Sequence, residues 1–110
     1  MSTSEPGLDR HEWESEMQAL EEQIADAPAE SLPELGDLVE RMLAERGYDL
    51  ADPVLREGEE REVVTEYLAA REIATLIERG DASVGPGDVA AAINGFRALY
   101  DHLVSGLGPS

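Results

Sequence analysis

Three glutamates and one histidine could together hold a metal ion or a small ligand. Glu59, Glu62 and Glu66 are spaced by three and four residues, so on an α-helix they share one face. A histidine from a second helix, His102, could complete such a site, because imidazole and carboxylate groups both bind metals. The candidate ligand set of the sequence is therefore Glu59, Glu62, Glu66 and His102.

The established catalytic and cofactor motifs are missing from the sequence. Neither His11 nor His102 follows a glutamate at a distance of three residues, which excludes the paired Glu-x-x-His motif of di-iron bundles. The chain has no cysteine, and the glycines around Pro86 match neither a phosphate-binding loop nor a dinucleotide fingerprint. We therefore predict no enzyme activity, no catalytic residue, no cofactor and no resident metal. His11 is expected at the surface and His102 partly buried.

Glu66 also has a structural interpretation. Its neighbours on both sides of the helical wheel are apolar, and a carboxylate that leaves water without a partner costs several kcal/mol. If the two helices that flank the turn at residues 80–85 form an antiparallel hairpin, Arg97 and Glu66 lie at similar distances from this turn. The sequence therefore predicts a buried ion pair between Glu66 and Arg97.

Capping residues and apolar periodicity predict the helices that must position these side chains. The predicted helices begin at Asp9, at Ser31, near Asp52 and Pro53, and at Gly85. They end before Pro28, at Gly47, at Gly80 and near Gly106. The short connections favour antiparallel neighbours, and no strand pattern is present. We predict an all-α fold, either a four-helix up-and-down bundle or a closely related helical array.

The first and third predicted helices differ in the width of their apolar surface. The third is apolar around more than half of its wheel, which places it centrally. The first has only a narrow stripe, typical of a coiled-coil seam. So narrow a stripe favours contact with a second copy of the chain, so we predict a homodimer. Its candidate interface is Trp13, Met17, Leu20 and Ile24.

Length and charge limit the remaining possibilities. A chain of 110 residues fits one helical domain over residues 1–110, with residues 1–7 and 107–110 expected to fray. The net charge of −17 makes direct binding of nucleic acid or of an anionic membrane improbable. No signal peptide or membrane span is recognisable, so a cytoplasmic location is expected.

Three functions are compatible with these observations. The leading hypothesis is a non-catalytic helical interaction or adaptor protein that self-associates and offers its acidic surface to a protein with a basic surface. The first alternative is a bundle that binds a metal or small ligand through its carboxylates. The second is an acidic regulator that mimics nucleic acid in the basic cleft of another protein.

Overall fold

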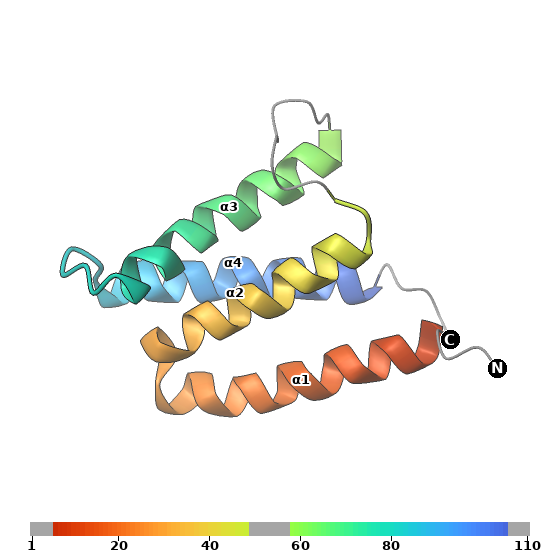
Figure 1. The fold of residues 1–110 in the computed structure, drawn as a ribbon, viewed down its shortest axis with the longest axis horizontal. Helices are drawn as coiled ribbons and strands as arrows, with labels where there is room; N and C mark the ends of the chain where they lie inside the picture. Colours follow the sequence, from red (N-terminus) through yellow and green to blue (C-terminus); the bar gives the residue numbers. More distant parts are fainter. Residues whose placement is uncertain (1–5, 49–57, 106–110) are drawn as a thin grey trace.

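The computed structural model describes the backbone of residues 6–48 and 58–105 and the side chains of residues 11–48, 58 and 61–105. Within these ranges the chain forms four helices and no strand. They are α1 (Pro6–Asp26), α2 (Pro28–Glu45), α3 (Gly58–Glu78) and α4 (Pro86–Ser105). Successive helices run in opposite directions (Figure 1). The predicted all-α, up-and-down arrangement of four helices is confirmed.

The helices form a flattened array. Its principal extents are 49, 35 and 19 Å. α2, α3 and α4 all contact one another, while α1 packs mainly against α2. α2 therefore contacts all three other helices and lies between α1 and α3 (Figure 1). The expectation that the third helix is the central one is wrong, because α2 takes that position.

Helix ends follow the glycine and proline signals of the sequence more closely than the polar capping signals. Gly47 (φ +86°) and Gly80 (φ +72°) each follow a helix in the left-handed conformation. In both cases the residue after the glycine donates its N–H to the carbonyl five residues earlier: Tyr48 to Leu43, and Asp81 to Leu76. α4 begins at Pro86 as predicted, and the N–H of Gly85 donates to the Asp88 carboxylate.

Two predicted helix starts are wrong. α2 begins at Pro28 rather than at Ser31, because proline at the first helical position has its φ angle already fixed. Ser31 therefore lies within the helix, where its hydroxyl donates to the carbonyl of Ala27 at 2.8 Å. α1 begins at Pro6, which places Asp9 inside the helix rather than before it.

Some predicted boundaries cannot be compared with the structure. Asp52, Pro53 and Gly106 lie outside the described residues. The predicted frayed ends also fall largely outside them, although α1 includes residues 6 and 7.

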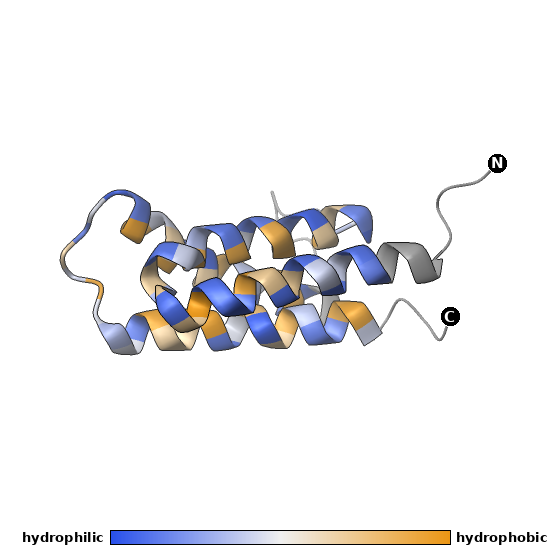
Figure 2. Ribbon diagram, turned by 90° about the horizontal axis from the view of Figure 1, so that it is seen from below, coloured by the Kyte–Doolittle hydropathy of each residue, from blue (hydrophilic) through white to orange (hydrophobic). Residues whose placement is uncertain are grey.

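A single apolar core joins the four helices. Phe96 of α4 is fully buried, and its ring lies close to Gly36 of α2 and to the ring of Tyr67 in α3. Along each helix, hydrophobic positions alternate with hydrophilic ones (Figure 2). The helices therefore have one face in the core and one face in water. The α2 residues that are completely buried are Leu32, Leu35, Leu38, Val39 and Leu43.

Candidate functional site

The described members of the predicted ligand set, Glu62, Glu66 and His102, do not form one metal site. Glu62 and Glu66 are exposed on α3, and His102 is exposed in the last turn of α4 rather than partly buried. The side chain of Glu59 lies outside the described residues. Among the residues that are described, no three His, Cys, Asp or Glu side chains lie close enough to hold a metal ion. His11 is exposed, as predicted.

The predicted ion pair between Glu66 and Arg97 is wrong. Arg97 instead contacts Glu21 of α1 through two hydrogen bonds, one of them from Nε to Oε2 at 2.9 Å. The hydrogen bonds raise the pKa of Arg97 above its ordinary value. Glu66 is exposed, so it needs no buried partner. Arg97 reaches α1, whereas Glu66 lines a groove between α3 and α4, although the two residues lie at similar distances from the turn.

The predicted dimer seam is buried inside a single chain. Its four residues have exposed fractions of only 6–8 %, so they do not form a free surface for a second copy. A stripe this narrow is sufficient because α1 has one principal neighbour, α2. The prediction of an exposed interface is therefore wrong for all four residues, which are Trp13, Met17, Leu20 and Ile24. Trp13 is a core residue of the single chain, and the Arg41 guanidinium lies 5.6 Å from its ring centre.

Arginines connect the helices to one another. Arg41 of α2 donates to Glu16 of α1 at 2.6 Å, and Arg46, just after α2, donates to the carbonyl of Leu103 in α4 at 2.9 Å. The second contact provides a partner for a carbonyl in the last turn of α4, where a cation is also favoured by the helix dipole. Together with Arg97, these residues tie α1 to α2, α2 to α4, and α4 to α1.

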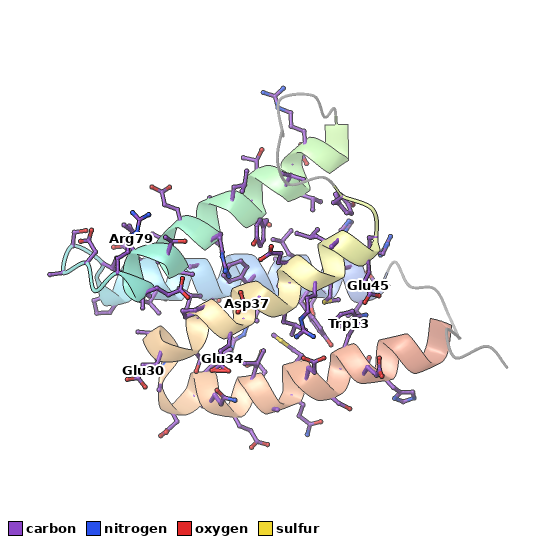
Figure 3. All side chains as sticks on the ribbon, viewed as in Figure 1. Trp13, Glu30, Glu34, Asp37, Glu45 and Arg79 are labelled. Atoms are coloured by element: carbon purple, nitrogen blue, oxygen red, sulfur yellow. The ribbon has the colours of Figure 1, made fainter. Side chains whose placement is uncertain are left out.

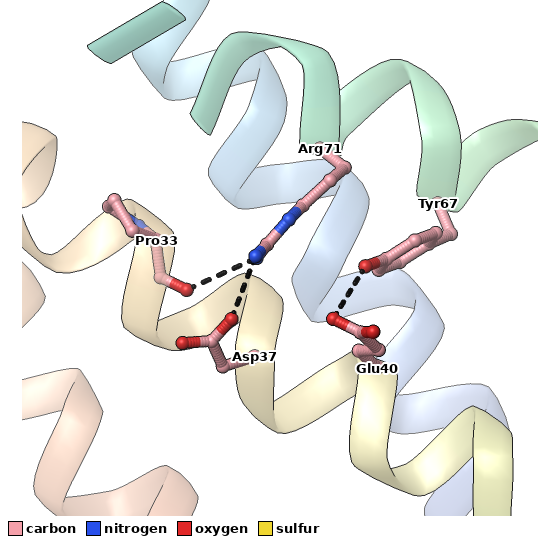
Figure 4. A network of polar contacts seen from close by, with 5 residues as sticks. All are labelled: Pro33, Asp37, Glu40, Tyr67 and Arg71. Carbon is pink, nitrogen blue, oxygen red and sulfur yellow. Dashed lines mark hydrogen bonds and ion pairs between the residues drawn. The ribbon is translucent and has the colours of Figure 1, made fainter. Parts of the chain in front are cut away.

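A fourth arginine lies in a polar network between α2 and α3 (Figure 4). Arg71 of α3 donates to the Asp37 carboxylate at 2.8 Å and to the Pro33 carbonyl at 3.3 Å. One turn earlier, the Tyr67 hydroxyl donates to Glu40 Oε1 at 3.2 Å. Burial is the main cause that raises the pKa of Tyr67 to about 12, and the carboxylate of Glu40 contributes in the same direction.

The raised pKa of Tyr67 predicts a loss of stability in alkaline solution. In the unfolded chain a tyrosine loses its proton near pH 10, whereas the folded protein holds this proton until about pH 12. Stability is therefore intact below about pH 10 and falls as the pH rises toward 12, by roughly 2–3 kcal/mol if the whole shift is realised. Urea unfolding at a series of pH values measures this loss. Tyr67→Phe should remove the fall in stability between about pH 10 and pH 12. If the variant loses as much stability over this range as the original protein, Tyr67 is not the cause.

The outer surface is strongly acidic because the chain has 25 acidic residues against only eight basic ones. Four of the eight arginines in the chain make the contacts described above. Every acidic side chain that the structure describes is exposed except Glu21, which is half-buried. Carboxylates follow the outer face of α2 along its length (Figure 3). They are Glu30, Glu34, Asp37 and Glu45.

A shallow groove lies between α3 and α4 and has a volume of about 220 Å³. Its floor is apolar, and one carboxylate stands on each helix beside it: Glu66 on α3 and Asp88 on α4. We call this feature the α3–α4 groove. Its other lining residues are Ala69, Ala70, Ile73, Ala91, Ala92 and Gly95.

Comparison with known proteins gives no functional assignment. No family model, curated protein or solved structure matches the chain. None of the helices in the described ranges is long and apolar enough to cross a membrane. The acidic surface and the α3–α4 groove are the features of the described residues that bear on function.

Proposed function

We propose that the chain is a non-catalytic helical interaction protein of the cytoplasm whose acidic surface binds a protein with a basic surface. The observation that carries this proposal is the excess of exposed carboxylates. The chain has 25 acidic residues against eight arginines, and every described carboxylate except that of Glu21 is exposed. The protein thus presents much of its net charge of −17 to its surroundings.

A surface of this kind has predictable effects on association. An extended surface whose charges have one sign attracts an oppositely charged partner over a distance of about 10 Å at 0.1 M salt. This attraction raises the rate at which the two proteins associate. The same charge repels nucleic acid and anionic lipid. These effects favour a protein partner that carries clustered lysine or arginine.

The two alternative functions have different support. Metal or small-ligand binding through Glu59, Glu62, Glu66 and His102 gains no support from the described residues, since Glu62, Glu66 and His102 do not converge. Mimicry of nucleic acid is a special case of binding to a basic partner. It predicts that DNA or RNA competes with this protein for the partner, whereas another basic partner would show no such competition.

Self-association remains a prediction, but the seam that suggested it is buried within the chain. Two copies would also bring two surfaces of the same sign together, which opposes contact between them. Sedimentation equilibrium at tens of micromolar protein decides between a dimer and a monomer.

The proposal is tested with a partner that is first cross-linked in the source cells and then purified separately. We expect the purified components to form a complex whose affinity falls about tenfold or more between roughly 50 and 200 mM salt. Glu30→Gln combined with Glu34→Gln should slow association, since both carboxylates are exposed on α2. Gln18→Ala, which changes an exposed neutral residue of α1, is the control. A complex that is insensitive to salt and to the double replacement would contradict the proposal.

A further inference from the structure

The α3–α4 groove is open on the side of the hairpin that faces away from α2. All of its lining residues belong to α3 and α4. On α3, the side chains that reach α2 are different ones, Tyr67 and Arg71. α2 thus covers one side of this helix pair, and neither α1 nor α2 contributes to the other side.

Small side chains give the floor of the groove a shape that suits a helix. Ala91 is exposed on α4, and Gly95, one turn further along, is partly exposed. Ala69 on α3 is also exposed, while Ile73 is partly buried. The absence of large side chains lets another helix approach α3 and α4 closely, and its apolar residues could fill the hollow between them.

The charges beside the groove specify the chemistry of the occupant. Glu66 and Asp88 line it from opposite helices, and both are exposed. None of the lining residues is basic. A helix that docks here would be stabilised by cations on both of its flanks, close to these carboxylates. A second copy of this chain is a poor occupant, because its described carboxylates are also exposed and it carries the same net charge of −17.

We propose that the α3–α4 groove docks an amphipathic helix of another protein, with a narrow apolar face and lysine or arginine on both sides of that face. This inference rests on the proposed function and specifies the partner element and its place of binding. Docking of an amphipathic helix into a groove is a common mode of recognition. The apolar groove between the starts of α2 and α4, lined by Val84, Pro86 and Ile93 among others, has no charged lining residue to specify an occupant.

The test uses the full chain and two synthetic peptides of about 14 residues, or four helical turns. The first is an amphipathic helix with an Ala and Leu face flanked by lysines, and the second is a scrambled sequence of the same composition. Binding is measured by isothermal titration, and the site is located from amide NMR shifts. We expect the first peptide to bind about tenfold more tightly than the second and to shift residues around Ala69, Ala91 and Gly95.

A matched pair of variants separates groove binding from general charge attraction. Ala91→Arg blocks the groove, and Ala25→Arg makes the same change at an exposed position of α1. We expect the first to weaken binding of the amphipathic peptide about tenfold and the second to weaken it less than about twofold. Glu66→Gln should weaken binding to a smaller extent. Unchanged circular dichroism spectra confirm that the variants fold.

Each other outcome has a defined meaning. Equal binding of both peptides, with equal effects of the two arginine variants, would overturn the groove and leave the proposed function standing. If neither peptide binds at low salt, both the groove inference and the proposed function are overturned. Shifts of the same groove residues that depend on protein concentration without peptide would identify a second copy of the chain as the occupant and overturn this inference.

Discussion

Replacement of Phe96 by alanine is expected to lower the free energy of unfolding by about 3–5 kcal/mol. Phe96 is fully buried, and its ring lies 6.0 Å from the ring of Tyr67, between centroids, at an angle of 53°. The change removes apolar contacts to α2 and α3 and leaves a cavity that the helices can close only in part. Because domains of this size are typically stable by about 5–15 kcal/mol, the loss should appear as a much lower urea midpoint.

Asn94→Ala is the control for this experiment. Asn94 is exposed on the same helix, so its replacement should change stability by no more than about 0.5 kcal/mol. A Phe96→Ala protein as stable as this control would show that α4 does not use Phe96 to contact α2 and α3 in solution.

The second large effect is expected at Gly36, where α2 passes close to both α3 and α4. A Cβ atom at this position would overlap the end of the Arg71 side chain and lie 3.1 Å from Cζ of the Phe96 ring. Gly36→Leu adds three further carbon atoms, so Arg71 must give up its contacts with Pro33 and Asp37 and the helices must separate. We expect a loss of roughly 3 kcal/mol, measured by urea unfolding.

Gly95→Ala provides a matched comparison, because it also introduces a side chain at a helical glycine. Its Cβ would meet only the Cβ of Ala70, at an ordinary distance of 3.7 Å. Alanine has a higher helix propensity than glycine, so this variant should gain up to about 1 kcal/mol. Equal effects of Gly36→Leu and Gly95→Ala would contradict the close approach of α2 to Arg71 and Phe96.

The fold class was predictable because its signals are local. Gly47 and Gly80 end helices because glycine adopts a positive φ angle without strain, and Pro86 begins one because its φ angle is fixed. Competing local signals explain the error at Ser31. Ser31 could cap the helix and Pro28 could begin it, and the two residues lie only three positions apart. The geometry of the connection from α1 decides between them.

The candidate site was less predictable, because a pattern along one helix does not identify its neighbour. The apolar stripe of α1 predicts which of its residues are buried, and the four stripe residues are buried in the structure. The same stripe could be covered by α2 or by a second chain, and the sequence of α1 does not decide between them. The wide apolar surface of α3 likewise does not reveal that α2 is the helix with three neighbours. The α3–α4 groove also depends on which faces of α3 and α4 meet, and neither helix shows this on its own.

The sequence by itself determined the helical content, the approximate helix ends and the net charge, because each depends on residue type and short-range spacing. Only the tertiary structure decided which arginine meets which carboxylate. Counting from the turn places Arg97 and Glu66 at similar depths, but the rotation of α4 directs Arg97 to Glu21 on α1. Depth follows from the rise per residue, whereas the direction of a side chain depends on how each helix is rotated when all the helices pack their apolar faces together.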